Sequence, residues 1–314
     1  MNKIELTIIT PCFNEERNIL DCAKSISEIM IKTLPNVNYE HIFIDNNSED
    51  NTAQILGDLC KQDSHIKLLV NSRNVGAFVS IYKALQEASG LAIIPMYAAD
   101  MQDPAEVIPT FYNKWLEGYL TIFGVRKNRN ENFIMTKIRL LYYRIIQKFS
   151  ESYIPINAGE FLLADKKVID SIIATKDFEP YIRGMVAAAG VKSIEIEYNM
   201  NKRSKGKSST NLVKLFDIAI NAFISTTRIP ARLILMLGFF ISSLSLVIVL
   251  IKILNYSILS IGWIRDISIN TTLLLLIGGF QIFFIGLIGE YILSIHAQVR
   301  RVPESFFTKK INFE

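Results

Sequence analysis

The sequence predicts an α/β domain, built on a mostly parallel sheet wound by helices and followed by two transmembrane helices. Two observations carry this fold class. Through residues 6–100, short β-branched runs alternate with segments of helical periodicity, as is typical of such a sheet. The last third of the chain contains two stretches of 19 residues without a charge, 233–251 and 271–289. Each is long enough to cross a bilayer core of about 30 Å.

The elements of the predicted sheet follow one another in order. Strands are expected at 6–10, 41–44, 66–70 and 91–96, where apolar residues run together. Helices are expected at 14–31, 52–60 and 79–88, where apolar residues recur at helical spacing. Acidic or amide clusters lie at three of the four strand ends, among them Asp45–Asp50 and the stretch that ends at Asp100. Ligands of such sheets bind beyond the carboxyl ends of the strands, so these clusters predict the site.

Charge divides the 314-residue chain into regions. Only four charged residues fall within 233–299, and the mean hydropathy of the whole chain is +0.27. These values exclude disordered, collagen-like and coiled-coil proteins, and they exclude a wholly soluble one. Residues 1–182 carry 19 basic and 23 acidic side chains, whereas residues 183–232 carry nine basic and three acidic ones. A basic block directly before a hydrophobic region indicates binding to phosphate-bearing lipid rather than to nucleic acid.

The predicted domains follow this division: a catalytic domain at 1–210, an interfacial amphipathic helix region at 211–231, a two-helix transmembrane hairpin at 232–299 and a cytoplasmic tail at 300–314. Arginines flank the hairpin on its outer sides, at Arg228, Arg232, Arg300 and Arg301. The positive-inside rule therefore predicts a multi-pass protein of the inner (plasma) membrane, with its catalytic domain and both termini in the cytoplasm. The start of the chain has no signal-peptide pattern. The alternative to the transmembrane spans is a helical hairpin buried in a soluble protein. The alternative to the interfacial helix is an ordinary packed helix at 212–224.

The chemistry-bearing residues near the predicted strand ends are acidic: Asp45, Asp50, Asp100 and Asp103. Carboxylates at a crevice edge suit Mg²⁺ or Mn²⁺ holding a diphosphate, because these cations prefer oxygen ligands and share their shell with substrate phosphates. The sequence contains no phosphate-loop, dinucleotide-binding or nucleophile-elbow motif. Asp103 precedes Pro104, so helix capping is an equal alternative to a functional role for that residue.

Taken together, the motifs resemble those of the family 2 inverting glycosyltransferases, and among them the polyisoprenyl-phosphate group that is similar to dolichol-phosphate mannose synthase. The resemblance rests on the stretches 10–16 (TPCFNEE), 44–52 (IDNNSEDNT), 72–76 (SRNVG) and 99–108 (ADMQDPAEVI). It continues through 118–119 (GY), 124–126 (GVR), 157–161 (NAGEF), the loop 203–207 and the two hydrophobic stretches. It implies a GT-A-type domain with a Rossmann-like core that binds a nucleotide sugar and transfers a single sugar.

The resemblance also implies roles for residues of the donor site. Six residues would bind the nucleotide: Pro11, Asn14, Glu15, Asp45, Arg73 and Asn74. Asp100 matches the last carboxylate of the family's Asp-x-Asp metal motif, so it would bind both nucleotide and metal, with Gln102 as a further ligand. The first carboxylate of that motif is Ala98 in this chain, which weakens a two-ligand metal site. Glu160 is the candidate general base, with Asp103 and Arg126 as further catalytic residues. A solvated surface glutamate is the alternative for Glu160.

The acceptor implied by the resemblance is a polyprenyl phosphate, such as undecaprenyl phosphate, at the cytoplasmic membrane face. Arg126, Arg203, Lys205 and Lys207 would bind its phosphate, because arginine makes bidentate phosphate contacts and a loop containing glycine and serine can close over the donor. The acceptor oxygen would attack the anomeric carbon with inversion, aided by positioning and by charge neutralisation of the leaving diphosphate. A merely solvated basic loop is the alternative for residues 202–208.

Two other functions compete with this hypothesis. One is a processive or glycan-extending transferase, although the Gln-x-x-Arg-Trp signature of processive relatives surrounds neither Trp115 nor Trp263. The other is an inactive membrane scaffold, because Ala98 and Glu160 depart from the family's pattern. Uridine is the favoured base of the donor, and the sequence does not name the sugar. Glycines at 278, 279, 286 and 289 permit close helix approach and hence a homo-oligomer.

Overall fold

The computed structural model describes residues 3–127, 153–177, 180–201 and 305–313, together with Phe240 and helical positions scattered from Leu274 to Val299. The chain forms two compact units. The first contains residues 1–226 and 301–314, and the second contains residues 227–300.

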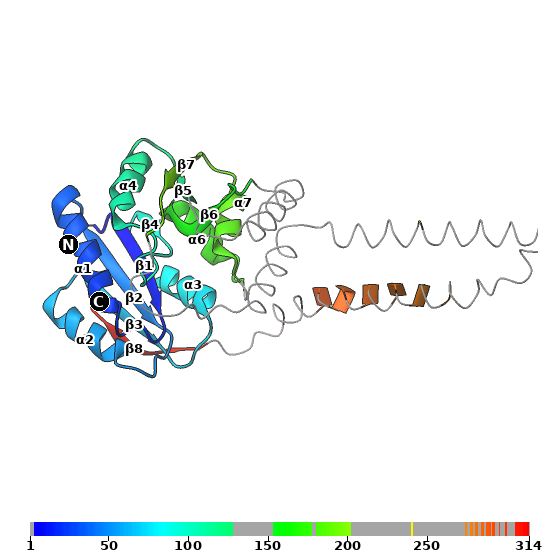
Figure 1. The fold of residues 1–314 in the computed structure, drawn as a ribbon, viewed down its shortest axis with the longest axis horizontal. Coiled ribbons are helices and arrows are strands. Elements are labelled where there is room, and N and C mark those ends of the chain that lie inside the picture. The colour runs from blue at the N-terminus through cyan, green and yellow to red at the C-terminus, as the bar shows by residue number, and fades with distance from the viewer. Residues whose placement is uncertain are drawn as a thin grey trace, which may run out of the picture. The chain divides into compact units, whose positions relative to one another are not determined.

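An eight-stranded mixed sheet is the centre of the first unit, and its strand order is β7-β5-β6-β4-β1-β2-β3-β8 (Figure 1). The strands are β1 (Leu6–Cys12), β2 (Tyr39–Asp45), β3 (Ile66–Asn71), β4 (Ala92–Ile94), β5 (Thr121–Arg126), β6 (Ala158–Asp165), β7 (Ser193–Tyr198) and β8 (Phe307–Ile311). Strands β1 to β4 pair in parallel, and β7 pairs in parallel with β5. Strands β6 and β8 run antiparallel to their neighbours. The predicted α/β class is confirmed.

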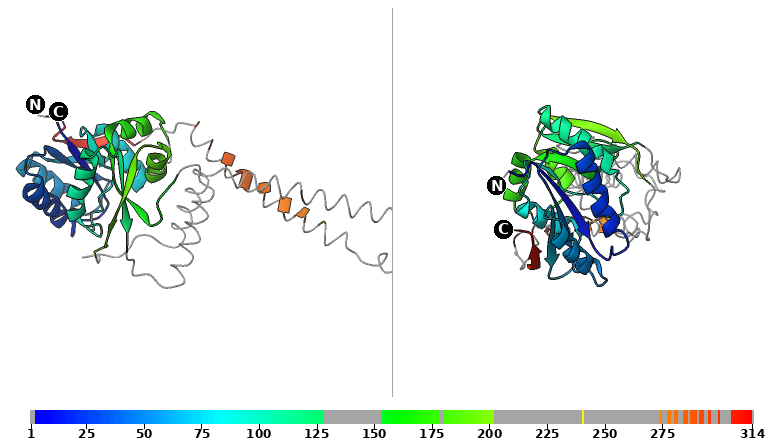
Figure 2. Two further views of the ribbon diagram at one scale, coloured as in Figure 1. Left: turned by 90° about the horizontal axis from the view of Figure 1, so that it is seen from above. Right: turned by 90° about the vertical axis from the view of Figure 1, so that its left-hand side faces the viewer.

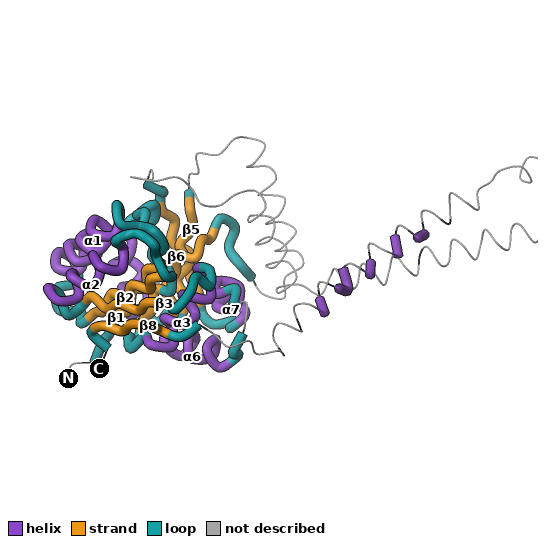
Figure 3. The backbone as a smooth tube through the Cα atoms, turned by 90° about the horizontal axis from the view of Figure 1, so that it is seen from below, coloured by secondary structure: helices purple, strands orange, loops and turns teal. Residues whose placement is uncertain are grey.

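Helices cover both faces of this sheet (Figures 2 and 3). They are α1 (Ile19–Thr33), α2 (Thr52–Gln62), α3 (Ala77–Glu87), α4 (Ile108–Leu116), α6 (Lys166–Ala174) and α7 (Ile182–Ala188), with a 3₁₀ turn η1 at Ala105–Val107. One buried cluster joins α1, α2 and α4 to one face, and a second cluster joins α3, α6 and α7 to the other. Successive residues of β1 alternate between the two clusters, with Ile8 in one and Ile9 in the other, because successive strand side chains point to opposite faces.

Two of the differences between predicted and observed element boundaries have a clear local reason. The first helix begins at Ile19 rather than at residue 14, because the chain turns there: Asn14 has a positive φ of 56°. Strand β4 covers Ala92–Ile94 rather than 91–96. Pro95 follows it directly and has no backbone N–H with which to extend the ladder.

The C-terminal segment contains a strand that the sequence does not reveal. Residues 307–311, within the stretch expected to be a tail, form β8 and pair with β3, as Figure 1 shows in red. The three central residues of β8 are exposed, so its sequence lacks the apolar run by which the other strands are recognised. The site-bearing unit therefore takes strands from both sides of the second unit in sequence.

Several predictions concern residues outside the described part of the chain. They include the amphipathic helix at 211–231 and nearly all of the first hydrophobic stretch. In the second stretch the described positions are helical, among them Leu274, Phe280 and Ile288. Within the described residues, no helix meets the length and hydropathy needed to cross a bilayer. The transmembrane hairpin therefore stays a prediction.

Candidate active site

One edge of the sheet collects the side chains that the sequence assigned to a site. In the parallel part, Cys12 lies opposite Asp45 and Asp45 lies opposite Val70, so β1, β2 and β3 end at the same level. In the other part, Arg126 lies opposite Tyr198. Because β6 runs antiparallel, its first residues, Ala158 to Glu160, come to this same edge beside Val125. Residues from six strands thus converge there, as expected for a sheet of this class.

The loops that follow β1 and β2 are joined to each other by hydrogen bonds. The backbone N–H of Asn14 donates to Ser48 Oγ at 2.9 Å, and the Asn14 side-chain oxygen accepts from the N–H of Glu49 at 2.9 Å. Ser48 in turn donates its backbone N–H to Asp45 Oδ2 at 3.0 Å and its hydroxyl to Asp45 Oδ1. Asparagine tolerates the left-handed backbone that Asn14 adopts. Asn14 and Asp45, predicted to bind one nucleotide, therefore belong to one connected network.

Asp45 is a buried carboxyl group at the end of β2, with 1% of its surface exposed. Burial raises the pKa of Asp45 above its ordinary value, although the hydrogen bonds from Ser48 oppose the shift. The two hydrogen bonds from Ser48 fix the orientation of this carboxyl group. Pro11 is half-buried one position before the end of β1, at the same edge of the sheet.

Glu15 and Asp50 join the same two loops one turn further on. The N–H of Glu15 donates to Thr52 Oγ1 at 2.9 Å, and the N–H of Glu16 donates to Asp50 Oδ2 at 3.2 Å. Partial burial acts against ionisation of Asp50, but hydrogen bonds from the Thr52 side chain, the Thr52 N–H and the Glu16 N–H lower its pKa overall. Asp50 thus serves as an acceptor for the loops themselves, which is a structural role.

A chain of asparagines supports the loop after β3, where Arg73 and Asn74 are both exposed. Asn46 donates to Asn74 Oδ1 at 2.8 Å, and the Asn46 side-chain oxygen accepts from the N–H of Val75 at 3.0 Å and from Asn71 Nδ2 at 3.2 Å. Asn46 is buried. Asn46 was not predicted to belong to the site, although its place between Asp45 and Asn47 in the polar cluster was a usable signal.

Asp100 and Gln102 occupy a tight turn beyond β4. Asp100 Oδ1 accepts from the N–H of Gln102 at 3.3 Å, and Met101 between them has a positive φ of 54°. The N–H of Asn201 donates to the Gln102 carbonyl at 2.8 Å, which ties the turn to the segment after β7. Among the described residues, no three His, Cys, Asp or Glu side chains gather into a metal-ligand cluster. Ala98 is half-buried in the same turn.

Asp103 and Arg126 form the strongest ion pair of the site. Arg126 Nη2 lies 3.0 Å from both carboxylate oxygens of Asp103, and Arg126 Nε lies 3.2 Å from Asp103 Oδ1. Tyr198 donates its hydroxyl to Asp103 Oδ1 and accepts from Arg126 Nε at 3.1 Å. The Asp103 side chain is 4% exposed. Although burial acts against the charged form, Asp103 and Tyr198 raise the pKa of the Arg126 guanidinium further above its ordinary value.

This geometry decides between the two interpretations of Asp103. No side chain caps the 3₁₀ turn η1 that follows Asp103, so the capping interpretation is wrong. Asp103 instead holds Arg126 across the end of β6. A side chain in place of Gly159 would have its Cβ only 3.2 Å from the Arg126 guanidinium carbon, so the guanidinium group would have to shift by a few tenths of an ångström. Tyr198 is a member of the cluster that the sequence did not predict, because no local motif marks it.

Glu160 follows this glycine on β6, and its side chain is 16% exposed. Arg183 Nε on α7 lies 3.7 Å from Glu160 Oε1. Burial raises the pKa of Glu160 above its ordinary value, while the nearby Arg183 and Arg126 cations oppose the shift. Glu160 is therefore not a solvated surface residue. Its carboxyl group is influenced by two arginines, of which Arg183 was not predicted.

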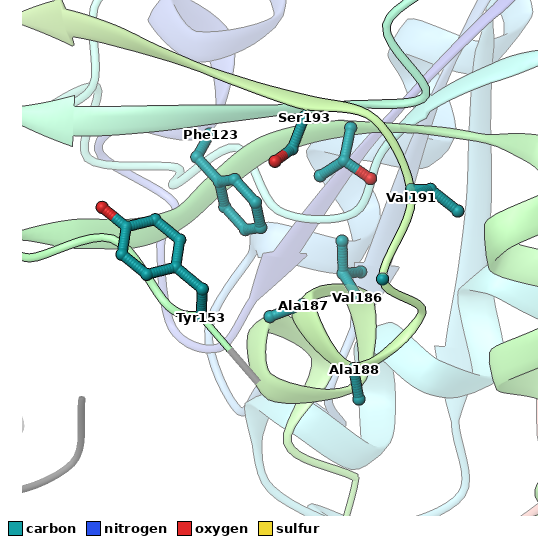
Figure 4. Close-up of a pocket in the computed structure, with 9 residues that line it drawn as sticks. Phe123, Tyr153, Val186, Ala187, Ala188, Val191 and Ser193 are labelled. Carbon is teal, nitrogen blue, oxygen red and sulfur yellow. The ribbon is translucent and has the colours of Figure 1, made fainter. Parts of the chain in front are cut away.

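A separate pocket of about 290 Å³ lies between β5, β7 and α7 (Figure 4). The rings of Phe123 and Tyr153 line one side of it, and Val186 and Val191 line another. Its strand residues come from the starts of β5 and β7, whereas the convergent edge lies at their ends. No carboxylate or cation lines it. This pocket is not the candidate active site.

The basic residues assigned to the acceptor fall into two groups. Arg126 lies in the cluster at the sheet edge, whereas Arg203, Lys205 and Lys207 lie outside the described residues. Within the described part of the chain, Arg126 donates to protein atoms through Nε and Nη2. Its Nη1 edge makes no hydrogen bond to a described residue.

A doubly wound sheet that brings buried carboxylates, amides and an arginine-flanked glutamate to one edge defines an α/β enzyme for a charged, nucleotide-like substrate. Comparison with known proteins gives the family. Residues 7–173 match the model of glycosyl transferase family 2. An uncharacterized glycosyltransferase of Synechocystis is 31% identical, over 96% of this chain and 93% of its own length. The chain belongs to glycosyl transferase family 2, and it is a glycosyltransferase with the GT-A-like fold of nucleotide-sugar transferases.

Two further comparisons extend over most of the chain. A prophage-derived bactoprenol glucosyl transferase of Shigella flexneri is 28% identical, over 98% of each chain. Among solved structures, a mannosyltransferase of Pyrobaculum calidifontis in complex with GDP-Man and Mn²⁺ matches with a TM-score of 0.49 and 17% identity, over 70% of this chain and 65% of that one.

Proposed function

We propose that this glycosyltransferase transfers one sugar from a nucleoside-diphosphate sugar, with UDP as the favoured nucleotide, to a polyprenyl phosphate, with inversion at the anomeric carbon. The observation that carries the proposal is the placement of Glu160 between Arg126 and Arg183, at the sheet edge that also holds Asp45. A carboxyl group with a raised pKa beside two guanidinium groups suits an acceptor that is itself a phosphate.

The acceptor class has independent support in the relatives. Several proteins named bactoprenol glucosyl transferase, from Shigella phages and Shigella flexneri, match at 28% identity over 96–98% of this chain. Bactoprenol phosphate is a polyprenyl phosphate, so these names agree with the acceptor that the basic residues favour. The match extends through the hydrophobic region and does not stop at the end of the sheet.

The donor site is assigned to the loops after β1, β2 and β3. Pro11, Asn14, Glu15 and Asp45 would line the nucleotide, and the exposed Arg73 and Asn74 would flank the nucleoside from the third loop. The fixed network around Asp45 supports this assignment, because a preorganised acceptor loses little entropy when it binds a base or ribose.

A divalent cation, Mg²⁺ or Mn²⁺, would bind at the turn beyond β4. Asp100 supplies a carboxylate and Gln102 an amide oxygen, and the donor diphosphate would complete the shell. The donor set fits, because Mg²⁺ is commonly held by one or two carboxylates together with substrate phosphates. Such a cation would neutralise charge on the leaving diphosphate. The single carboxylate predicts weak metal binding in the absence of the nucleotide.

The remaining residues would act on the acceptor. A phosphate oxygen attacks the anomeric carbon, the bond from that carbon to the diphosphate breaks, and the nucleoside diphosphate leaves. An acceptor that arrives as a monoanion gives its proton to Glu160, whereas a dianion needs no base. The free Nη1 edge of Arg126 would hold the acceptor phosphate together with Arg203, Lys205 and Lys207, and Asp103 keeps Arg126 in place.

The membrane is the proposed site of action. Residues 233–251 and 271–289 would cross it, with residues 211–231 at the interface and the catalytic unit and both termini in the cytoplasm. Described helical positions of the second unit expose large apolar side chains, among them Leu274, Ile285, Ile292 and Val299, which supports contact with lipid or with a second copy. The glycines at 278, 279, 286 and 289 would permit a homo-oligomer.

The test uses the purified full-length chain with undecaprenyl phosphate, Mg²⁺ or Mn²⁺ and a panel of labelled nucleotide sugars. We expect one donor to give a lipid-linked product with a single sugar, and we expect a chelator to abolish it. Glu160→Gln serves as the matched variant that tests the role of Glu160 as a base. A product that carries several sugars would indicate a glycan-extending enzyme. Absence of product with every donor, together with absence of nucleoside-diphosphate binding by calorimetry, would indicate an inactive scaffold.

A further inference from the structure

Lys83 is a buried lysine on α3 that lies away from the proposed reacting groups, with 5% of its surface exposed. Its ammonium group donates to Asn71 Oδ1 at 2.8 Å, to Ser305 Oγ at 2.7 Å and to the Ser305 carbonyl. A lysine has three N–H donors, and these three acceptors use all of them. Lys83 Nζ also lies 4.3 Å from the centroid of the Phe307 ring, at cation–π distance.

These contacts join two segments that are distant in sequence. Asn71 is the last residue of β3, and Ser305 begins the C-terminal segment 305–313 that contains β8. The backbone joins them at the same point, because the N–H of Ser72 donates to the Phe306 carbonyl at 2.9 Å. Lys83 therefore fixes the C-terminal segment at the place where β3 ends and the loop 72–76 begins.

The hydrogen bonds continue from Lys83 into the donor side of the site. Asn71, which accepts from Lys83, donates through Nδ2 to Asn46 at 3.2 Å. Asn46 then binds both the Asn74 side chain and the N–H of Val75. An unbroken path of buried polar groups thus runs from Ser305 through Lys83, Asn71 and Asn46 to the loop 72–76. If Lys83 only stabilised the sheet, the hydrogen bonds from Asn71 through Asn46 to the loop 72–76 would not be required.

We propose that Lys83 is a positioning residue, which uses the C-terminal segment 305–313 as a brace for the donor loop 72–76. The inference rests on the proposed function, in which this loop flanks the nucleoside of the donor. When the path is intact, Asn46 holds Asn74 and Val75 in one arrangement. Without the ammonium group, Asn71 loses a partner, its amide reorients, and the loop samples several arrangements. The donor then binds less tightly, while the chemical step keeps its groups.

The test compares Lys83→Met with Lys310→Met in the full-length chain. Methionine keeps the length and apolar stem of lysine at a buried position. Lys310 lies on β8 and pairs with Glu87 of α3 at 2.7 Å, so it joins the same two elements without contacting Asn71. Ser305→Ala is the milder variant, because it removes one acceptor hydroxyl and leaves the buried lysine two partners.

We expect Lys83→Met to raise the KM for the donor about tenfold and to change kcat less than threefold, with an unchanged KM for the polyprenyl phosphate. Ser305→Ala should raise the donor KM about threefold, and Lys310→Met should not change it. Calorimetry with UDP or GDP, whichever the unaltered chain binds, should show the same ranking. An unchanged donor KM in Lys83→Met, or an equal effect in Lys310→Met, would overturn the proposal.

Hydrogen exchange provides a readout that needs no substrate. The N–H groups of Val75 and Gly76 are protected by the side chains of Asn46 and Asn74. Lys83→Met should speed their exchange at least tenfold and leave the amides of β1 unchanged. If the unaltered chain makes no lipid-linked product, the proposed function fails, yet this exchange measurement still tests the brace. If product forms and the exchange of Val75 and Gly76 is unchanged, the brace alone is wrong.

Discussion

The ion pair between Asp103 and Arg126 allows a quantitative test of its contribution to folding stability, separately from its contribution to activity. The Asp103 side chain is 4% exposed and the Arg126 side chain 21% exposed. Removing either partner leaves the other charge unpaired in a largely buried position. Asp103→Leu and Arg126→Met should each therefore lower the free energy of unfolding by about 3–5 kcal/mol.

The double variant should behave differently from the sum of the two. When both charges are replaced by apolar side chains, no uncompensated charge remains, and such replacements are often close to neutral. We therefore expect the free energy of unfolding of the double variant to lie within about 2 kcal/mol of that of the unaltered chain. The Tyr198 hydroxyl would then form hydrogen bonds with water. The resulting coupling energy, at least about 4 kcal/mol, is well above the value of about 0.5 kcal/mol that marks independent sites.

The assay is denaturant unfolding of the full-length chain in detergent, followed by fluorescence of Trp115 in a Trp263→Phe background, since the chain has two tryptophans. The neighbouring pair of Lys127 and Glu197, 3.4 Å apart and about two-thirds exposed, is the matched control. Lys127→Met should change stability by less than about 1 kcal/mol. Additive effects at Asp103 and Arg126 would refute the reasoning. The double variant should be stable but inactive. If it were active, Arg126 would not be needed to bind the acceptor.

Three further predictions follow from the same geometry. Glu160→Gln should slow transfer to the monoanionic acceptor and therefore lower activity more as the pH falls. The variant should be at least as stable at pH 7, because a folded-state pKa raised above the ordinary 4.5 means that folding disfavours the charged form as pH rises; a fall in its unfolding midpoint would contradict that. Ala98→Asp should lower the metal concentration that gives half-maximal transfer about tenfold, measured by Mn²⁺ titration, since it adds a second carboxylate near Asp100; an unchanged titration would place the metal elsewhere. Burial lowers the pKa of His41 to about 3, so the unfolded chain binds the extra proton and stability should fall by about 1 kcal/mol between pH 7 and pH 5.5. His41→Asn should remove that part of the pH dependence, and an identical slope in both chains would refute the assignment.

The sequence predicted those parts of the fold and site that depend on local periodicity. Strands and helices up to residue 100 are visible because each buried element repeats its apolar residues at its own spacing. Once the strands are known to be parallel, their carboxyl ends are expected at one edge of the sheet, and no further pattern in the sequence is needed. Asp45 and Asn14 could therefore be assigned to one site before any coordinate was known, and the structure links them through Ser48.

The partners of Asp103 could not be predicted in this way. Arg126 and Tyr198 reach it from β5 and β7, and the pairing of these strands depends on the order of the sheet rather than on any pattern near Asp103. The local sequence instead offered helix capping as an equal alternative, because Asp103 precedes Pro104. Arg183 could not be predicted for the same reason, because its contact with Glu160 depends on how α7 packs on β6.

The C-terminal strand shows a further limit and has a structural consequence. Strand β3 would be an open edge without β8, and open edges invite pairing with other chains. The segment is held at both ends: Ser305 binds Lys83, and Asn312 donates to the carbonyls of Cys60 and Ile66 at 2.8 Å and 2.7 Å. These side-chain contacts join residues more than 200 positions apart and add to the backbone pairing of β8 with β3. A chain cut after β7, the last described strand before the second unit in sequence, would therefore lose the edge cover and the partner of Lys83 together. The donor loop and the far end of the chain thus depend on each other.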